Sequence, residues 1–219
     1  MIKALKALKA SKNLHGFDEI SIKLLKVSAS YVCSPLTHIC NNSILSGIFP
    51  DCMKFSIVKP IYKKGNKMNQ TNYRPISLLT SFSKVFEKAL HNRITEHLNT
   101  HNLLVRNQFG FRKGTATEDA IFKLTNEILK ALNNKTLAGS IFCDLEKAFD
   151  SVSRDILLSK LFCYGISGKA KSLLKSYLQN RYQRVLITHF LTQSFRMYQN
   201  KMWGAAGLNF RPFVIPVIH

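Results

Sequence analysis

The sequence predicts an α+β fold that is mostly helical, and two observations lead to this prediction. Apolar residues recur every three or four positions in several long segments, which is typical of amphipathic helices. A few shorter segments are rich in β-branched and aromatic residues and are bounded by turn residues, which is typical of strands. With 219 residues, of which 46% are hydrophobic, the chain is long enough for one domain with a real core, or for one and a part.

Charge is the most unusual property of the composition. The chain has 32 Lys and Arg residues against 12 Asp and Glu residues, a formal net charge of +20. A basic excess of this size indicates a polyanionic partner, nucleic acid first and an anionic membrane second. A well-solvated basic surface without any partner is the alternative.

The remaining composition indicates an intracellular protein, cytoplasmic or nuclear. No apolar run approaches membrane-spanning length, and the Lys-rich start lacks the apolar core of a secretory signal. The five cysteines show no Cys-x-x-Cys pair and no zinc-like spacing with histidine, so we expect reduced thiols.

The first fifty residues are expected to be helical. Residues 1–13 are rich in lysine, and Asp18 is placed to cap a helix that runs to about Ser30. The inward residues of that helix would be Ile20, Leu24 and Val27. A further helix, from Tyr31 to Leu45, should end at Gly47.

A basic β-hairpin is predicted next. Phe55 to Tyr62 has the pattern of a strand, residues 63–66 that of a turn, and Tyr73 to Ile76 that of a second short strand or extended run. No acidic residue lies between Asp51 and Glu87. A hairpin of this kind can lie over phosphates, and a solvated loop is the alternative. The cations of the segment are Lys54, Lys59, Lys63, Lys64, Lys67, Arg74 and Lys84.

Four further helices are expected. Phe82 to Leu98 has the clearest apolar stripe, and Thr115 to Glu118 has capping-box spacing for a helix over about 116–132. Ser153 to Cys163 and Ser167 to Leu178 are also expected to be helical, with a break at Gly165. A basic turn with Arg181 and Arg184 would then lead into a strand.

Between these helices, Ser140 to Asp144 has the pattern of a buried strand that ends at a carboxylate. Its faces would carry Ile141, Cys143 and Leu145 on one side, and Phe142 and Asp144 on the other. An acid at the exit of an apolar strand is poorly solvated, so it would need a cation or a metal. A turn or cap residue is the alternative reading of Asp144.

The string Asp144-Leu-Glu-Lys-Ala148-Phe149-Asp150 resembles motif A of reverse transcriptases, in the form of non-LTR (LINE-type, jockey-like) retrotransposons. Three other strings are similar to motifs of the same family and come in the same order: Pro60 to Gly65 with Asn72 to Leu79, Asn107 to Thr115, and Tyr177 to Ile187. The resemblance covers about residues 1–187. It implies the fingers (1–139) and the start of a truncated palm (140–187) of a right-hand polymerase, followed by a tail (188–219).

The resemblance also implies roles for single residues. Asp144 would be one of three carboxylates that hold two Mg²⁺ ions, with the backbone carbonyl of Leu145 as a further ligand. Phe149 would be the steric gate that selects dNTPs, whereas Asp150 fits better as a helix cap. Lys63 and Arg74 would hold the triphosphate, and Gln108 and Arg112 would face template and nucleotide. Contacts to the RNA template, the DNA primer or other single-stranded nucleic acid are expected from Lys59, Lys64, Lys67, Lys113, Arg181 and Arg184.

Two motifs of the family do not follow in this sequence. The family continues with Gly-Val-Pro-Gln-Gly-Ser and then with a Tyr/Phe-x-Asp-Asp hairpin that carries the other two carboxylates, but no acidic residue follows Asp155 here. We therefore expect no polymerisation by this chain alone. Three hypotheses stay open: an incomplete reverse transcriptase, a non-catalytic basic module that binds nucleic acid, and a retrotransposon remnant without a function.

The tail has an unusual coding property. Met202 and Trp203 have one codon each, and reading one base later gives TGT and GGG, which encode Cys and Gly. With permitted third bases, the shifted frame can read Cys-Gly-Val-Pro-Gln-Gly-Ser-Ile-Leu-Gly-Pro-Leu-Leu-Phe through Ile215. This is the missing motif, so we predict a frameshift between Ile187 and Met202 and an out-of-frame tail.

Overall fold

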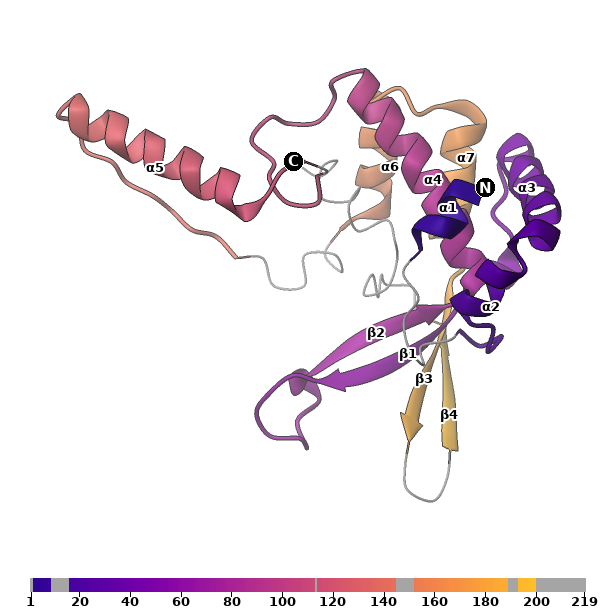
Figure 1. The fold of residues 1–219 in the computed structure, drawn as a ribbon. Coiled ribbons are helices and arrows are strands. Elements are labelled where there is room, and N and C mark those ends of the chain that lie inside the picture. Colours follow the sequence, from indigo (N-terminus) through magenta and orange to yellow (C-terminus); the bar gives the residue numbers. More distant parts are fainter. Residues whose placement is uncertain (1, 9–15, 113, 145–151, 189–192, 200–219) are drawn as a thin grey trace.

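The structure is a computed structural model, and it describes residues 2–8, 16–112, 114–144, 152–188 and 193–199. The predicted mixture of helices and sheet is present (Figure 1). The helices are α1 (Ile2–Ala7), α2 (Ile22–Val27), α3 (Ala29–Ser46), α4 (Ser81–Thr100), α5 (Thr117–Asn133), α6 (Arg154–Cys163) and α7 (Gly168–Leu178). The strands are β1 (Phe55–Tyr62), β2 (Tyr73–Leu79), β3 (Tyr182–Thr188) and β4 (Gln193–Gln199), and short 3-10 turns lie at Asp51–Met53 and Gln70–Asn72.

The four strands form one sheet in the order β2-β1-β3-β4. The predicted hairpin of β1 and β2 is antiparallel, with Ser56 opposite Leu79 and Tyr62 opposite Tyr73. β3 adds to the other edge of β1 in parallel, with Phe55 opposite Tyr182, and β4 turns back antiparallel to β3. β1 therefore has a partner on each side, and the basic hairpin projects from the helical body (Figure 1).

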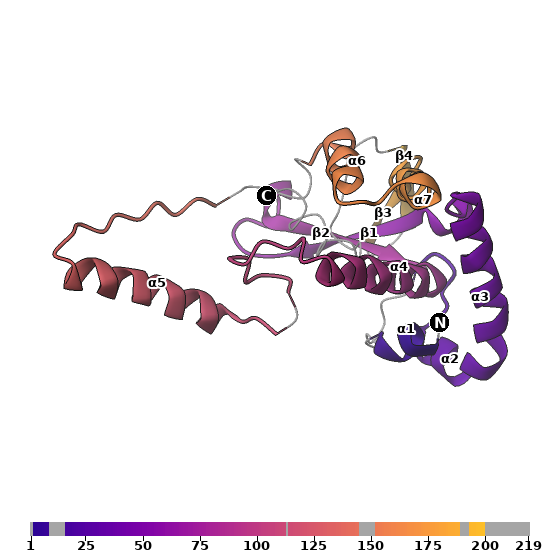
Figure 2. The same cartoon turned by 90° about the horizontal axis from the view of Figure 1, so that it is seen from above.

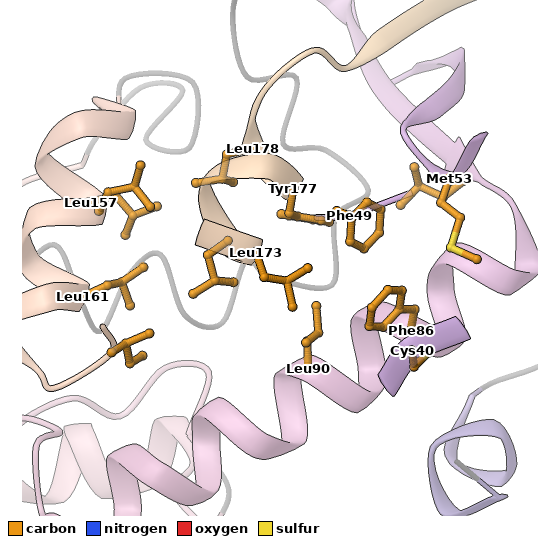
Figure 3. Close-up of a cluster of buried hydrophobic side chains, with 14 of the residues drawn as sticks. Cys40, Phe49, Met53, Phe86, Leu90, Leu157, Leu161, Leu173, Tyr177 and Leu178 are labelled. Carbon is orange, nitrogen blue, oxygen red and sulfur yellow. The ribbon is translucent and has the colours of Figure 1, made fainter. Parts of the chain in front are cut away.

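The main core forms where α4, α6 and α7 meet, as Figure 3 shows. Phe49 is fully buried, stacks on Phe86 with ring centroids 5.0 Å apart, and meets Tyr177 edge to face at 4.9 Å. Leucines of all three helices fill the rest, as the apolar spacing of 82–98, 153–163 and 167–178 predicts. Burying such rings is worth roughly 1.5–3 kcal/mol each, so this cluster is expected to dominate stability.

A second, smaller cluster joins the N-terminal helices to α4. It contains Leu5, Leu25, Cys33 and Val85. The predicted inward face of the first long helix is wrong, since Leu24 and Val27 are exposed and Ile22 and Leu25 are buried. The reason is the start of α2: the Ser21 hydroxyl accepts from the Leu24 N–H at 3.1 Å, whereas Asp18 accepts from Ile20, so the helix begins later than expected.

α5 differs from the other long helices, because it stands away from the helical body in both views (Figures 1 and 2). Its start is held by the Asp119 carboxylate, which accepts from the Ala116 N–H at 2.7 Å, and not by the predicted pair Thr115 and Glu118. None of its residues is buried. Exposed apolar side chains line it: Ile121, Phe122, Leu124, Ile128, Leu129 and Leu132.

The predicted strand over 140–144 is absent from the structure. These residues are outside the helices and strands, and Ile141 and Phe142 are 92% and 82% exposed. A strand needs a ladder partner, and residues 140–144 pair with none of the four strands of the sheet. The prediction of a buried strand at 140–144 is therefore wrong, since nothing among the described residues buries this apolar segment.

Candidate nucleic-acid interface

The hairpin places three of the predicted cations on one face. Opposed residues of an antiparallel ladder share a face, as do residues two apart along a strand. Ile61 is opposite Arg74 and Lys59 is opposite Ile76. Lys63 continues the alternation after β1, since its N–H still donates to the carbonyl of Asn72 at 2.8 Å. Lys59, Lys63 and Arg74 therefore form one group, which we call the cationic face; all three are exposed.

Hydrogen bonds hold the tip of the hairpin in shape. The Tyr62 hydroxyl donates to the carbonyl of Gly65 at 2.5 Å, and the Tyr73 hydroxyl donates to the carbonyl of Lys67 at 2.8 Å. Gly65 has a φ of 93° and a Cβ there would lie 2.6 Å from the Asn72 amide, so glycine is required at this turn. The exposed Lys64 and Lys67 thus stand on an ordered tip, with the Lys67 ammonium 5.8 Å from the Tyr62 ring centroid.

Lys54 is the exception among the cations of this segment. It is 3% exposed, its ammonium pairs with Asp51 at 2.8 Å, and it lies 3.5 Å from the Ser176 hydroxyl. Lys54 therefore joins β1 to α7 and is not available to a phosphate. The other cations of the hairpin face solvent, and the 35 residues from 52 to 86 contain no carboxylate that would neutralise them.

The segment 105–115, which contains Gln108 and Arg112, folds back on itself. The Arg112 guanidinium donates to the carbonyl of Val105 at 3.2 Å, and the Gln108 amide donates to the carbonyl of Gly110 at 3.0 Å. The Thr115 hydroxyl lies within 3.1 Å of the carbonyls of Phe109 and Arg112. Both predicted side chains are half-buried and already bonded to their own loop. Lys113 lies outside the described residues.

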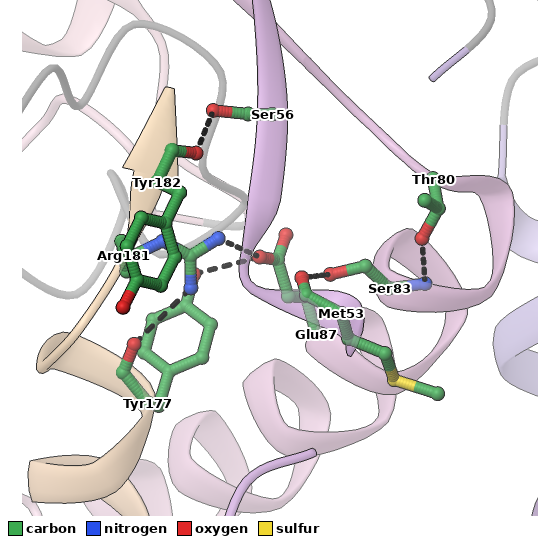
Figure 4. A network of polar contacts seen from close by, with 8 residues as sticks. All are labelled: Met53, Ser56, Thr80, Ser83, Glu87, Tyr177, Arg181 and Tyr182. Carbon is green, nitrogen blue, oxygen red and sulfur yellow. Dashed lines mark hydrogen bonds and ion pairs between the residues drawn. The ribbon is translucent and has the colours of Figure 1, made fainter. Parts of the chain in front are cut away.

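Arg181 was predicted to contact nucleic acid, and the structure corrects this. Its guanidinium lies 3.9 Å from the fully buried Glu87 carboxylate, stacks over the Tyr177 ring at 4.6 Å and donates to the Tyr177 carbonyl at 3.1 Å (Figure 4). The side chain is only 13% exposed. A charge this far from solvent needs its counter-ion, so Arg181 serves the packing of α7 and β3 on α4.

Arg184 is also half-buried, but it lies on the cationic face. It is the register partner of Ile57, and its guanidinium stands 5.6 Å from the Phe55 ring centroid. In a parallel pair, register partners point to the same face, so Arg184 shares the face of Lys59. It extends the line of cations from the hairpin to the third strand.

Among the described residues, no metal centre is assembled around Asp144. The Asp144 carboxylate is exposed, so the premise of an acid buried at a strand exit is wrong here. Within the described ranges, no three His, Cys, Asp or Glu side chains gather closely enough to hold a metal ion. Two Mg²⁺ ions need several carboxylates, and Asp144 by itself does not fit them. Leu145, Phe149 and Asp150 lie outside the described residues.

Sequence reasoning missed the network around Glu87. The Tyr177 hydroxyl donates to the Glu87 carboxylate at 2.7 Å, and both residues are fully buried (Figure 4). Burial and the nearby carboxylate raise the pKa of Tyr177 well above its ordinary value. The spacing along α4 could have predicted the burial of Glu87. This residue lies three before Leu90 and four after Ser83, on the stripe of α4 that faces the core.

Comparison with protein families identifies the family of this chain. The family model described as reverse transcriptase (RNA-dependent DNA polymerase) matches residues 61–202. The matched span contains most of the hairpin, helices α4 to α7 and strands β3 and β4. The match ends at residue 202, which is 15 residues beyond Ile187. The resemblance that the sequence analysis describes stops at about Ile187.

Curated proteins from fruit flies are also similar. The chain is 34% identical over 188 residues to the "Probable RNA-directed DNA polymerase from transposon BS" of Drosophila melanogaster, which covers 83% of this chain and 20% of that protein. It is 34% identical over 167 residues to the corresponding protein from transposon X-element, covering 76% and 18%. For the polymerase from mobile element jockey of Drosophila funebris the identity is 30% over 171 residues, covering 78% and 19%. The chain thus spans about a fifth of the length of these relatives.

Across the part of the chain that is described, every helix is too short or too polar to cross a bilayer.

Proposed function

Because this chain belongs to the reverse transcriptase family, we propose that it is a portion of a retrotransposon RNA-directed DNA polymerase and that its cationic face binds phosphates. The relatives favour this descent over an unrelated basic module. The observation that carries the proposal is the register of the hairpin, which places Lys59, Lys63 and Arg74 on one exposed face. Arginine offers a planar fork to phosphate oxygens and lysine a point charge.

The domain assignment belongs to the same proposal. Residues 1–139 would be the fingers and 140–187 the start of a palm, in a right-hand polymerase. The hairpin would then hold the triphosphate of a dNTP through Lys63 and Arg74, and the RNA template or DNA primer would lie along Lys59, Lys64 and Lys67. Gln108 and Arg112 would act near the template after giving up the loop contacts described above, and Phe149 would exclude the 2′-hydroxyl.

Catalysis is not assigned to this chain. In two-metal nucleotidyl transfer, Mg²⁺ ions stabilise the attacking and leaving oxygens, and several carboxylates must hold them. Asp144 is one exposed carboxylate, and the described residues around it do not complete a site. We therefore derive only binding from these residues and expect no template-directed extension by the 219-residue chain.

The test is salt-dependent binding of a labelled single-stranded RNA. Replacing Lys63, Lys64 and Arg74 together by Ala should weaken binding and lower the slope of log K against log salt by about 2, because each lost phosphate contact on a single strand accounts for about 0.7. The matched control replaces three exposed lysines of the helices, Lys3, Lys169 and Lys175. If both triple variants change the slope equally, the RNA senses net charge and the hairpin is not the interface.

Primer extension separates binding from chemistry. With RNA template, DNA primer, dNTPs and Mg²⁺, the purified chain should bind the primer–template and leave the primer unextended. Any template-directed extension would show that the metal site is complete without further carboxylates. The interpretation of the chain as a catalytically incomplete polymerase would then be wrong.

A further inference from the structure

At the base of the hairpin the cationic face changes from charged to aromatic. Phe55 begins β1 and lies two residues before Ile57, so its ring is on the cationic face. Tyr182 is the register partner of Phe55 on β3 and shares this face. Phe17, far away in sequence, meets the Phe55 ring edge to face with centroids 5.0 Å apart.

The position of Phe17 is fixed by its neighbour. A Cβ on Gly16 would lie 2.6 Å from the Thr80 nitrogen and 2.8 Å from the Leu79 carbonyl carbon. Only glycine therefore lets this segment lie against the end of β2, which brings Phe17 over Phe55. The aromatic group is thus assembled from the N-terminal segment, β1 and β3.

Two of these rings are more exposed than packing alone requires. Phe17 is 41% exposed and Tyr182 is 42% exposed, whereas Phe49, Phe86 and Tyr177 in the core are at most 1% exposed. Arg184 lies beside the group, with its guanidinium 5.6 Å from the Phe55 ring centroid. Exposed rings next to cations, on a face without a carboxylate between residues 52 and 86, are complementary to a strand with phosphates and unpaired bases.

We propose that Phe17 and Tyr182, supported by Phe55, form a stacking platform for an unpaired base of single-stranded RNA whose phosphates follow the cationic face. From the level of Arg184, opposite Ile57, to Lys63 the face is about 20 Å long at about 3.3 Å per residue. This length suits a short run of nucleotides, at the lower end of the roughly 4–16 that single-strand sites hold. The diagonal from Lys59 to Arg74 spans about 7–8 Å across the strands, so the two can contact successive groups of one strand.

The inference rests on the proposed function, and it adds a subsite that reads the bases as well as the phosphates. Phosphate contacts alone would bind a strand equally well with or without its bases. A stacking platform adds affinity only where a base is present, and it accepts all bases because each has a π-face.

The experiment compares two labelled strands by fluorescence anisotropy with the full chain: a 12-nucleotide oligouridylate and an abasic strand with the same sugar–phosphate backbone. The parent protein should prefer the oligouridylate. Tyr182→Ala and Phe17→Ala should each weaken oligouridylate binding roughly 5- to 100-fold and leave abasic binding unchanged. Tyr182→Phe keeps the ring and should retain the preference, and Tyr31→Ala, which removes an exposed ring of α3, is the matched control.

The outcomes separate the two proposals. If the parent binds both strands equally, the platform is refuted while the phosphate interface stands. If Tyr182→Ala weakens both strands equally, the ring supports the fold or the cations and does not stack on a base, which also refutes the platform. If the parent binds neither strand, the proposed function fails as well. Circular dichroism melts of each variant identify any variant that does not fold; if Tyr182→Ala is one of them, Phe17→Ala carries the comparison.

Discussion

Helices α4 and α5 have similar lengths and similar apolar spacing, yet only α4 is packed. α4 crosses the core and buries seven residues, among them Val85, Phe86 and Leu90. α5 carries at least as clear an apolar stripe, with Ile121, Leu124 and Ile128, and buries none. Periodicity therefore shows that a helix has a face to bury, but it does not show which segment covers that face.

The same contrast extends beyond the two helices. The partners of α4 come from α1, α2, α3, α6 and α7 and from the turn after Gly47, all within the described chain. The segment that follows α5 is itself exposed, with Leu137, Ile141 and Phe142 open to solvent. A large exposed apolar surface is typical of a site where another segment or protein packs. The first prediction concerns the part of the gene that would encode a segment packing on α5.

The largest expected effect comes from the reading frame near Met202. We predict that the nucleotides there, read one base later, encode Cys-Gly-Val-Pro-Gln-Gly-Ser and the apolar run after it. The family match ends at residue 202, where this shifted reading begins. Sequencing the gene checks it, and codons that do not permit the motif would exclude the frameshift.

If the motif is present, a protein made in the restored frame should cover α5. A helix of 17 residues that buries none of them is marginal in water, so the amide hydrogens of α5 should exchange rapidly in the present chain. In the restored protein they should exchange at least tenfold more slowly. Unchanged exchange of α5, with the body still protected as an internal control, would mean that the restored segment is not its partner.

The next prediction compares the loss of stability when one phenylalanine of α4 and one of α5 are replaced by alanine. Phe86 is 1% exposed and stacked on Phe49, so Phe86→Ala should lower the free energy of unfolding by about 3–5 kcal/mol. Phe122 is 69% exposed on α5, so Phe122→Ala should change it by less than about 0.5 kcal/mol. Urea unfolding followed by far-UV circular dichroism measures both. Similar losses for the two variants would mean that α5 is packed in solution.

Local signals predicted most of the fold correctly. The strand Phe55–Tyr62 has the expected bounds, and the helix ends at Gly47 and Gly165 coincide with positive φ values of 73° and 84°. Strand bounds and helix ends of this kind are determined by residues close in the sequence, so they can be predicted from the local pattern alone. The helices expected over 153–163 and 167–178 are present as α6 and α7, which start directly after Ser153 and Ser167.

Long-range pairing could not be predicted in the same way. β3 joins β1 through partners such as Phe55 and Tyr182, which are far apart in sequence, and no local pattern specifies this edge. The segment 140–144 shows the reverse case, since it has the composition of a strand but pairs with none of the four strands of the sheet. Arg181 looks like any surface cation in the sequence, and only the fold brings it to Glu87.

A further prediction concerns Glu87, the one acid within the core stripe of α4. Glu87→Gln keeps the shape but removes the charge opposite Arg181, so we expect a loss of about 1–3 kcal/mol in urea unfolding, less than for Phe86→Ala. Tyr177→Phe removes only the hydroxyl and should cost about 0.5–1.5 kcal/mol. Since the two groups share a hydrogen bond, the double variant should cost less than the sum of the single losses.

The pKa of Tyr177 adds a pH test of the same network. Its folded-state pKa is raised by burial and by Glu87, so the neutral phenol is favoured in the folded protein. This contribution to stability is complete below the unfolded value of about 10 and is lost as the pH rises above it. Parent protein should therefore lose stability above about pH 10 more steeply than Tyr177→Phe. Equal slopes for the two proteins, or a Glu87→Gln variant as stable as the parent, would show that the buried carboxylate does not hold α7 against α4.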